Sequence, residues 1–199
     1  MACWVGIDVG AERKAFHLAA VDERGVVRGP QRLERAAVLA RVWELDPLVV
    51  ALDSPRSYAA PGATRRAAER LFAEAKICGI RWTPDEAAVR AARAAGSSYY
   101  DWIVNGLRLY EALEREGLGD RVVECFPTAS WTVWAGERHD GRAAWTRAAL
   151  ASLAVPGLPS RRLNQDDRDA VAAALTARLV SHDGVRVFGG ELVVPTRRP

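Results

Sequence analysis

Apolar segments of strand length open the chain and are separated by turn-forming residues. Residues 4–9 are apolar and partly β-branched and end at Gly10, a pattern typical of a buried strand. Residues 16–21 and 26–28 have the same character, and the Asp-Glu-Arg-Gly segment between them has the composition and length of a hairpin turn. The pattern therefore predicts three strands in antiparallel succession.

The next segment has the three- and four-residue spacing of an amphipathic helix. We expect the core-facing side chains of this helix to be Leu33, Ala36, Ala37, Ala40 and Trp43. Pro47 ends the helix, because proline cannot continue its hydrogen bonding. Residues 48–52 supply a fourth apolar strand, which ends at Asp53 just as the first strand ends near Asp8.

The second half of the chain contains mostly helical patterns. Helices are predicted at residues 65–75, 85–95, 102–116, 143–153 and 166–180, with a weak strand at residues 80–82. A fifth strand at residues 122–126 ends at Pro127, which starts a short helix. This order predicts an RNase H-like α/β fold. Its mixed five-stranded sheet, of three antiparallel N-terminal strands followed by parallel strands, is flanked by helices, with a helical insert before the fifth strand.

Composition narrows the class of protein. The 199 residues are 49% hydrophobic and 27% charged, which suffices for one buried core, so we expect a single domain over residues 1–199. A net charge of +3 and a pI of about 9.0 are compatible with a phosphate-bearing partner. Cys3, Cys78 and Cys125 lack the spacing of a disulfide framework or zinc site. Without an apolar run of the roughly 20 residues that cross a bilayer or an export signal, we expect a cytoplasmic protein with no membrane partner.

Acidic residues recur at the ends of the predicted elements. Asp8 and Asp53 end the first and fourth strands, Glu124 lies in the fifth, and the last helix begins with Asp166, Asp167 and Asp169. Each acid taken alone is explained as a turn or helix-start residue, except Glu124, which inside an apolar strand needs a partner. In this fold the first and fourth strands are neighbours, so their carboxylates converge with those of the closing helix. Together the acids predict a site for one or two Mg²⁺ or Mn²⁺ ions, which prefer oxygen ligands.

Helix geometry divides the acids of the last helix. Asp166 and Asp169 are three residues apart and share a face, whereas Asp167 is turned by about 100° from Asp166. We predict that Asp8, Asp53 and Asp169 are the metal ligands. Asp166 or Asp167 is expected to assist them. Glu124 is assigned a supporting catalytic role, as a ligand or as the partner of a ligand. The predicted reaction is hydrolysis of a phosphodiester bond in nucleic acid.

Short motifs occur in order along nearly the whole chain. They include Gly6-Ile7-Asp8-Val9-Gly10, Ala51-Leu52-Asp53-Ser54-Pro55, Arg66 with Glu69, Glu124-Cys125-Phe126-Pro127, Asp167-Arg168-Asp169-Ala170 and a closing Gly190-Glu191 with Pro195. In these motifs the chain resembles the predicted RNase H-fold nuclease family catalogued as domain of unknown function 429. The resemblance implies a nuclease fold, with activity assigned to that family by analogy. The family more often has glutamate at Asp167, so the resemblance favours this residue as a ligand where helix geometry favours its neighbours.

Other functions stay open as alternatives. Residues 6–10 also resemble the first phosphate loop of the actin and sugar-kinase phosphotransferases, but those proteins need two such domains. The lack of a G-x-G-x-x-G motif argues against a dinucleotide-binding fold. A non-catalytic module that binds nucleic acid or protein is the main alternative, and heat stabilisation by Mg²⁺ or Mn²⁺ would distinguish a nuclease from it.

Basic and aromatic residues supply candidate contacts with nucleic acid. We predict phosphate contacts from Arg65, Arg66, Arg90, Arg93 and Lys14, the last with its neighbour Arg13. Three tryptophans of the insert are suited to stacking on bases, although core packing is the favoured interpretation for Trp131, Trp134 and Trp145. The three histidines lack the spacing of metal ligands or of an acid-base pair.

Overall fold

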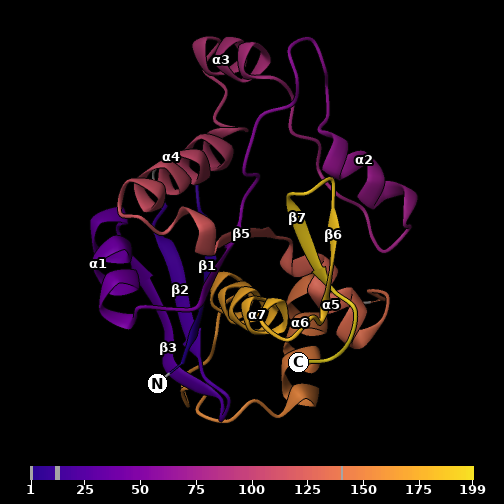
Figure 1. The fold of residues 1–199 in the computed structure, drawn as a ribbon. Helices are drawn as coiled ribbons and strands as arrows, with labels where there is room; N and C mark the ends of the chain where they lie inside the picture. Colours follow the sequence, from indigo (N-terminus) through magenta and orange to yellow (C-terminus); the bar gives the residue numbers. More distant parts are fainter. Residues whose placement is uncertain (1, 12–13, 140) are drawn as a thin grey trace.

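A mixed β-sheet forms the centre of the protein (Figure 1). The computed structural model describes residues 2–11, 14–139 and 141–199, and within them seven strands lie in the order β3-β2-β1-β4-β5-β7-β6. Their bounds are β1 Trp4–Asp8, β2 Phe16–Val21, β3 Val26–Leu33, β4 Val49–Asp53, β5 Val122–Cys125, β6 Val185–Phe188 and β7 Leu192–Pro195. Strand β2 is antiparallel to β1 and β3, whereas β4 is parallel to β1 and β5, and β7 is parallel to β5.

The strand order confirms the predicted RNase H-like class, but the predicted strand count was wrong. The described chain forms seven strands where five were expected, and the additional pair, β6 and β7, is an antiparallel hairpin after the last helix. Gly189 and Gly190 lie in its short connection with φ values of 59° and 77°, a region that favours glycine. Two short apolar runs around a Gly-Gly pair are a hairpin signal that the prediction missed.

Helices surround the sheet on both faces. In the described residues they are α1 Arg35–Leu45, α2 Ala67–Glu74, α3 Glu86–Ala94, α4 Asp101–Arg115, the 3₁₀ helix η1 Gly119–Arg121, α5 Pro127–Ala135, α6 Arg142–Leu153 and α7 Gln165–Val180. The helices predicted beyond residue 60 begin and end within two residues of these bounds. The weak strand predicted at residues 80–82 does not form. Among the described helices, none combines the length and apolar character needed to cross a membrane.

Helix α1 turns a different face to the core from the one predicted. Its buried residues are Val38 and Val42, whereas Trp43, expected in the core, is 66% exposed. Leu33, with which the predicted apolar series began, belongs to β3. The helix begins at Arg35, and Val38 and Val42, four residues apart, face the sheet. Trp43 follows Val42 directly and therefore points away from the core.

The two faces of the sheet carry different helices, and strand alternation decides which side chains meet which helix. In β1, Gly6 faces α7, whereas Val5 packs in the cluster with α1 and α4 on the other face (Figure 1). Asp8 continues the series of Gly6 and so faces α7. In β4, Ala51 packs on the α7 face, which places Asp53 there as well. Alternation therefore directs both strand-end aspartates toward one helix.

Helix α7 lies directly on β1 because Gly6 has no side chain. A Cβ at this position would lie 2.0 Å from the backbone N of Ala174 and 2.3 Å from the backbone O of Ala170. The alanines of this helix face are completely buried, as so close an approach of α7 to the sheet requires. The contact holds the first turns of α7, with Asp166 and Asp169, beside the ends of β1 and β4.

Candidate metal centre

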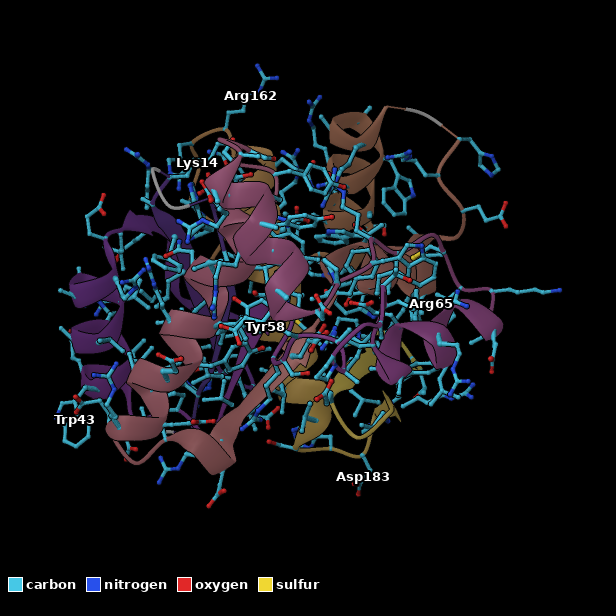
Figure 2. All side chains as sticks on the ribbon, turned by 90° about the horizontal axis from the view of Figure 1, so that it is seen from above. Lys14, Trp43, Tyr58, Arg65, Arg162 and Asp183 are labelled. Carbon is cyan, nitrogen blue, oxygen red and sulfur yellow. The ribbon has the colours of Figure 1, made fainter. Side chains whose placement is uncertain are left out.

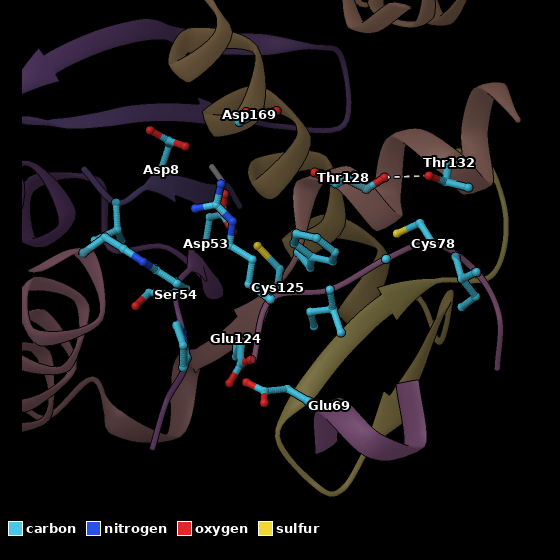
Figure 3. A pocket seen from close by; sticks show the side chains of 18 of the residues that line it. Asp8, Asp53, Ser54, Glu69, Cys78, Glu124, Cys125, Thr128, Thr132 and Asp169 are labelled. Atoms are coloured by element: carbon cyan, nitrogen blue, oxygen red, sulfur yellow. Dashed lines mark hydrogen bonds between the residues drawn. The ribbon is translucent and has the colours of Figure 1, made fainter. Parts of the chain in front are cut away.

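Four aspartates line one end of a cleft of about 760 Å³. Asp8 and Asp53 are register partners at the ends of the adjacent parallel strands β1 and β4. Asp166 and Asp169 reach the same cleft from the first turns of α7. Figure 3 shows Asp8, Asp53 and Asp169 on one side of this cleft, with Cys78 and Thr132 toward its other end. The structure thus brings together the carboxylates that the element order predicted to converge.

Burial and mutual repulsion raise the pKa values of Asp8, Asp53 and Asp169. The pKa of Asp53 is raised to about 8, mainly by burial and in part by the nearby charge of Asp169. The pKa of Asp8 lies well above its ordinary value for the same reason, with Asp53 as the strongest neighbouring charge. Burial also raises the pKa of Asp169. A cluster of this kind binds a cation in exchange for protons.

One arginine places a positive charge within the cluster. The Arg142 Nη2 donates a hydrogen bond of 2.8 Å to Oδ2 of Asp169. The Arg142 charge also lowers the pKa values of Asp8 and Asp53, against the stronger effect of burial. Two further donors hold the Asp169 carboxylate, the indole Nε1 of Trp131 at 2.9 Å and the amide of Gln165 at 3.0 Å. None of these three partners was predicted. Trp131 and Arg142 lie in other helices, so no local pattern indicates their contacts, whereas Gln165 lies one helical turn before Asp169 and its four-residue spacing is a local signal that was missed.

The donor set suits a hard divalent cation. Within the described residues, no three Asp, Glu, His or Cys side chains are arranged to hold one ion together. Mg²⁺ is commonly bound by only one or two carboxylates and completes its shell with water and substrate phosphate. Asp8 and Asp53 form such a pair, and Asp169 is held in its ion pair with Arg142. The residues therefore fit an ion whose remaining ligands come from solvent and substrate.

Asp167 does not line the cleft but belongs to a neighbouring network, which His17 links to Asp166 with Nε2 and Oδ2 3.9 Å apart. The Asp167 carboxylate is within 2.8 Å of Nδ1 of His17, pairs with Arg161, and accepts from the backbone N of Asn164 in a reciprocal capping box. Burial acts to raise its pKa, but the hydrogen bonds from Arg161 and His17 lower it overall. This contrasts with the raised pKa values in the cluster. The position of Asp167 is that of a structural residue at the start of α7.

Glu124 lies in a buried ion-pair network rather than among the aspartates. Val122 and Glu124 alternate onto the face of the sheet opposite Asp53, beside Leu52. There Arg66 donates to Oε2 of Glu124 at 2.6 Å and to Glu69 at 3.0 Å. Figure 3 shows Glu124 and Glu69 close together and away from Asp8. Glu124 thus has the partner that its place in an apolar strand demands, and the structure places it outside the carboxylate cluster.

The predicted phosphate contacts divide by exposure. Arg66 is 4% exposed and occupied by three carboxylates, those of Glu69, Glu124 and Glu191, so the prediction that it contacts phosphate was wrong. Arg90 and Arg93 pair with Glu86 and Asp101. Arg65 and Lys14 are exposed, on different sides of the molecule (Figure 2). Arg13 lies outside the described residues.

The tryptophans of the insert are core residues, as the favoured interpretation predicted. Trp131 and Trp134 are at most 2% exposed and pack edge to face, with ring centroids 5.4 Å apart. Trp145 is 8% exposed and lines the cleft. Packing thus makes the Trp131 and Trp134 rings unavailable to a nucleobase from solvent.

The strand order, with antiparallel β3-β2-β1 followed by parallel β4 and β5, is that of the RNase H-like fold class. The family model described as "Protein of unknown function (DUF429)" matches residues 6–192, and the chain belongs to this family. Among curated proteins none matches the chain. One similar solved structure is Thermus thermophilus RuvC in complex with Holliday junction substrate, which is 18% identical to this chain with a TM-score of 0.48. The match covers 98% of this chain and 99% of that chain. A second Thermus thermophilus RuvC structure is 16% identical, with a TM-score of 0.45 over 97% and 99% of the two chains.

Proposed function

We propose that the protein is a divalent-metal-dependent nuclease that hydrolyses phosphodiester bonds at the end of the cleft. The observation that supports this most is the pairing of Asp8 and Asp53 on adjacent parallel strands, both facing α7 and both with raised pKa values. Buried like-charged carboxyl groups are unfavourable in the folded protein and become favourable when a cation joins them. The arrangement is therefore better explained by a bound ion than by fold stability.

The carboxylates would hold the ion and fix its position against the substrate. Asp8 and Asp53 end two strands, β1 and β4, that have hydrogen-bonded neighbours on both sides, and this fixes the backbone positions from which they would bind the ion. Asp169 is oriented by Trp131 and Gln165, so it can join as a third ligand without searching for its rotamer. A bound Mg²⁺ or Mn²⁺ supplies an activated water and stabilises charge on the leaving oxygen. Asp166 also lines the cleft, with 48% of its side chain exposed, and could assist these ligands.

Arg142 has the charge and position to serve the substrate phosphate. Its side chain is 42% exposed and lines the cleft beside Asp169. Without substrate, its guanidinium offsets part of the negative charge of the aspartates. When a cation takes over that role, the guanidinium is free to turn toward an anionic oxygen in the cleft, which a planar double donor binds well.

Metal-dependent cleavage and metal-dependent stability together test this function. Purified protein is incubated with labelled single-stranded, duplex and branched DNA and with RNA, in Mn²⁺ and in EDTA, and its melting temperature is recorded in both. We expect cleavage of at least one substrate in Mn²⁺ alone, and a higher melting temperature with the ion. Asp8→Asn and Asp53→Asn should lose both effects. Asp183→Asn is a matched control, since Asp183 is exposed and has a φ of 52°, which asparagine tolerates.

The two readouts distinguish nuclease from binding module. Binding to nucleic acid without cleavage, and without any response of the melting temperature to Mn²⁺, would favour the non-catalytic alternative. Cleavage that survives both aspartate substitutions would place the chemistry elsewhere and refute the proposed site.

A further inference from the structure

Two aromatic side chains are exposed beside the cleft, and each is stacked by an arginine. Trp82 is 41% exposed with the Arg65 guanidinium 5.3 Å from its ring centroid. Tyr99 is 56% exposed with the Arg81 guanidinium 5.8 Å from its centroid. Tyr99 also packs edge to face on Tyr100, with centroids 4.9 Å apart. We call these five residues the aromatic ridge.

The ridge is continuous in space and adjoins the cleft. Trp82 follows Arg81 directly in the chain, so the two arginine–aromatic stacks share a backbone segment. Arg81 and Thr83, on either side of Trp82, both line the cleft that contains the aspartates. The ridge is built from the chain around α2, α3 and the start of α4, which lies beyond one end of the sheet (Figure 1).

The charges of the ridge are available to a ligand. Arg65 and Arg81 are exposed, and neither takes part in an ion pair within the described residues. This distinguishes them from Arg66, which is buried among carboxylates, and from Arg90, which pairs with Glu86. A guanidinium stacked on a ring keeps its edge donors free, so it can hold a phosphate while its ring partner holds a base.

We infer that the aromatic ridge binds single-stranded nucleic acid and leads it into the cleft. Unpaired bases expose their faces and stack on aromatic side chains, whereas a duplex presents phosphates and base edges only. Alternation of aromatic rings and free arginines matches alternation of bases and phosphates along one strand. The inference rests on the proposed function and adds the class of substrate. The nucleic acid would carry an unpaired segment next to the bond that is cut.

Binding in EDTA separates this inference from catalysis. Anisotropy of a short fluorescein-labelled oligothymidylate is titrated with wild-type protein and ridge variants, with a duplex of equal length for comparison. Trp82→Ala and Tyr99→Ala should each weaken single-strand binding by about 5- to 100-fold, the range of one base–aromatic stack. Trp82→Phe and Tyr99→Phe should bind nearly as wild type, because they keep the ring. Duplex binding should change little in all four variants.

Trp43→Ala is the matched control. Trp43 is more exposed than Trp82 but lies on α1, at the opposite edge of the molecule from Arg65 in Figure 2. Its loss should leave single-strand binding unchanged. Arg65→Gln and Arg81→Gln should each reduce the slope of log affinity against log salt by about 0.7, one phosphate contact on a single strand.

The outcomes distinguish failure of the ridge from failure of the nuclease. Tight single-strand binding that depends on both rings would support the ridge even if no substrate were cleaved. Equal losses in Trp82→Ala and Trp43→Ala, unchanged binding in both ridge variants, or no binding of the wild type to any nucleic acid would overturn it. Melting temperatures recorded in parallel identify an alanine variant that loses binding only because it unfolds. In that case the binding of Trp82→Phe and Tyr99→Phe tests the ridge.

Discussion

Arg142 and Asp169 join the first turns of two helices through a hydrogen bond of 2.8 Å at the end of the cleft. The Asp169 side chain is 3% exposed, whereas the Arg142 side chain is 42% exposed, so the pair links a buried carboxylate to a guanidinium that faces solvent. The arginine lowers the pKa values of Asp8, Asp53 and Asp169. The Arg142 charge therefore favours the ionised form of these carboxyl groups, against the stronger effect of burial.

Replacement of this arginine should shift the pH dependence of metal binding. Arg142→Gln removes the charge that favours the ionised aspartates, so the pH at which Mn²⁺ stabilises half of the protein should rise by about one pH unit, the lower end of the effect of a close opposite charge on a carboxyl group. Thermal melting with and without Mn²⁺ across pH 5–9 measures it. Arg147→Gln, an exposed position on the same helix, should leave the midpoint unchanged. An unchanged or lower midpoint in Arg142→Gln would contradict the prediction.

The metal-free protein should lose stability as pH rises toward 8. The pKa of Asp53 is about 8 in the folded protein against an ordinary value of 3.8, so the native state binds more protons than the unfolded state between these values. The free energy of unfolding then falls with rising pH across this window, at most by about 1.4 kcal/mol for each unit between the two pKa values. Asp53→Asn cannot ionise and should escape this loss.

Thermal melting in EDTA at pH 5 and pH 9 checks this prediction. The melting temperature of Asp53→Asn should exceed that of wild type by a larger margin at pH 9 than at pH 5. Added Mn²⁺ at pH 9 should reverse the order, since only wild type binds the ion. Parallel curves for the two proteins in EDTA would contradict a raised pKa of Asp53 in the folded protein.

Glu124 should prove more important for stability than for metal binding. Glu124→Ala leaves Arg66 without its two shortest contacts and should destabilise the fold by about 3–5 kcal/mol, as loss of one partner of a buried ion pair does. Urea unfolding measures this loss. Glu191→Ala removes the partly exposed member of the same network and should cost about 1 kcal/mol or less. If Glu124→Ala is stable but loses its response to Mn²⁺, the catalytic role first predicted for Glu124 would be correct.

Local sequence patterns predict the strands and α7 because each has one dominant period. The β1, β2, β4 and β5 segments are short apolar runs with clear ends, and α7 is bounded by a capping pattern at Asn164. Strand register then brings Asp8 beside Asp53 without further information. Two errors had local causes: the Gly-Gly hairpin was overlooked, and α1 was counted from a residue of β3.

Partners between distant segments could not be predicted in the same way. Arg66 meets Glu124 across 58 positions and Arg142 meets Asp169 across 27. Each of these arginines follows the same local rules as its exposed neighbours, Arg65 or Arg147. Only packing decides that Arg66 points inward and Arg65 outward. The phosphate contact predicted for Arg66 was therefore wrong. The exposed Trp82 ring beside Arg65 was not predicted.

The acids of α7 should divide into ligands and structural residues. Asp166 and Asp169 line the cleft, whereas Asp167 pairs with Arg161 and His17 and caps the helix. We expect Asp169→Ala to lose all Mn²⁺-dependent turnover, Asp166→Ala to lose most, and Asp167→Ala to lose least per folded molecule. Asp167→Ala should instead lower the free energy of unfolding by at least about 1 kcal/mol, the usual worth of a helix cap.

Turnover and unfolding must both be measured, because either alone misassigns Asp167. A destabilised variant loses activity at the assay temperature through unfolding, so turnover is normalised to the folded fraction from urea titration. Asp167→Asn refines the test, since it preserves the size of the side chain and part of the capping but removes the charge that pairs with Arg161. If normalised turnover of Asp167→Asn falls below that of Asp166→Ala, the start of α7 rotates when metal binds, and the family resemblance, which aligns Asp167 with a recurrent acid, is the better guide to the ligand.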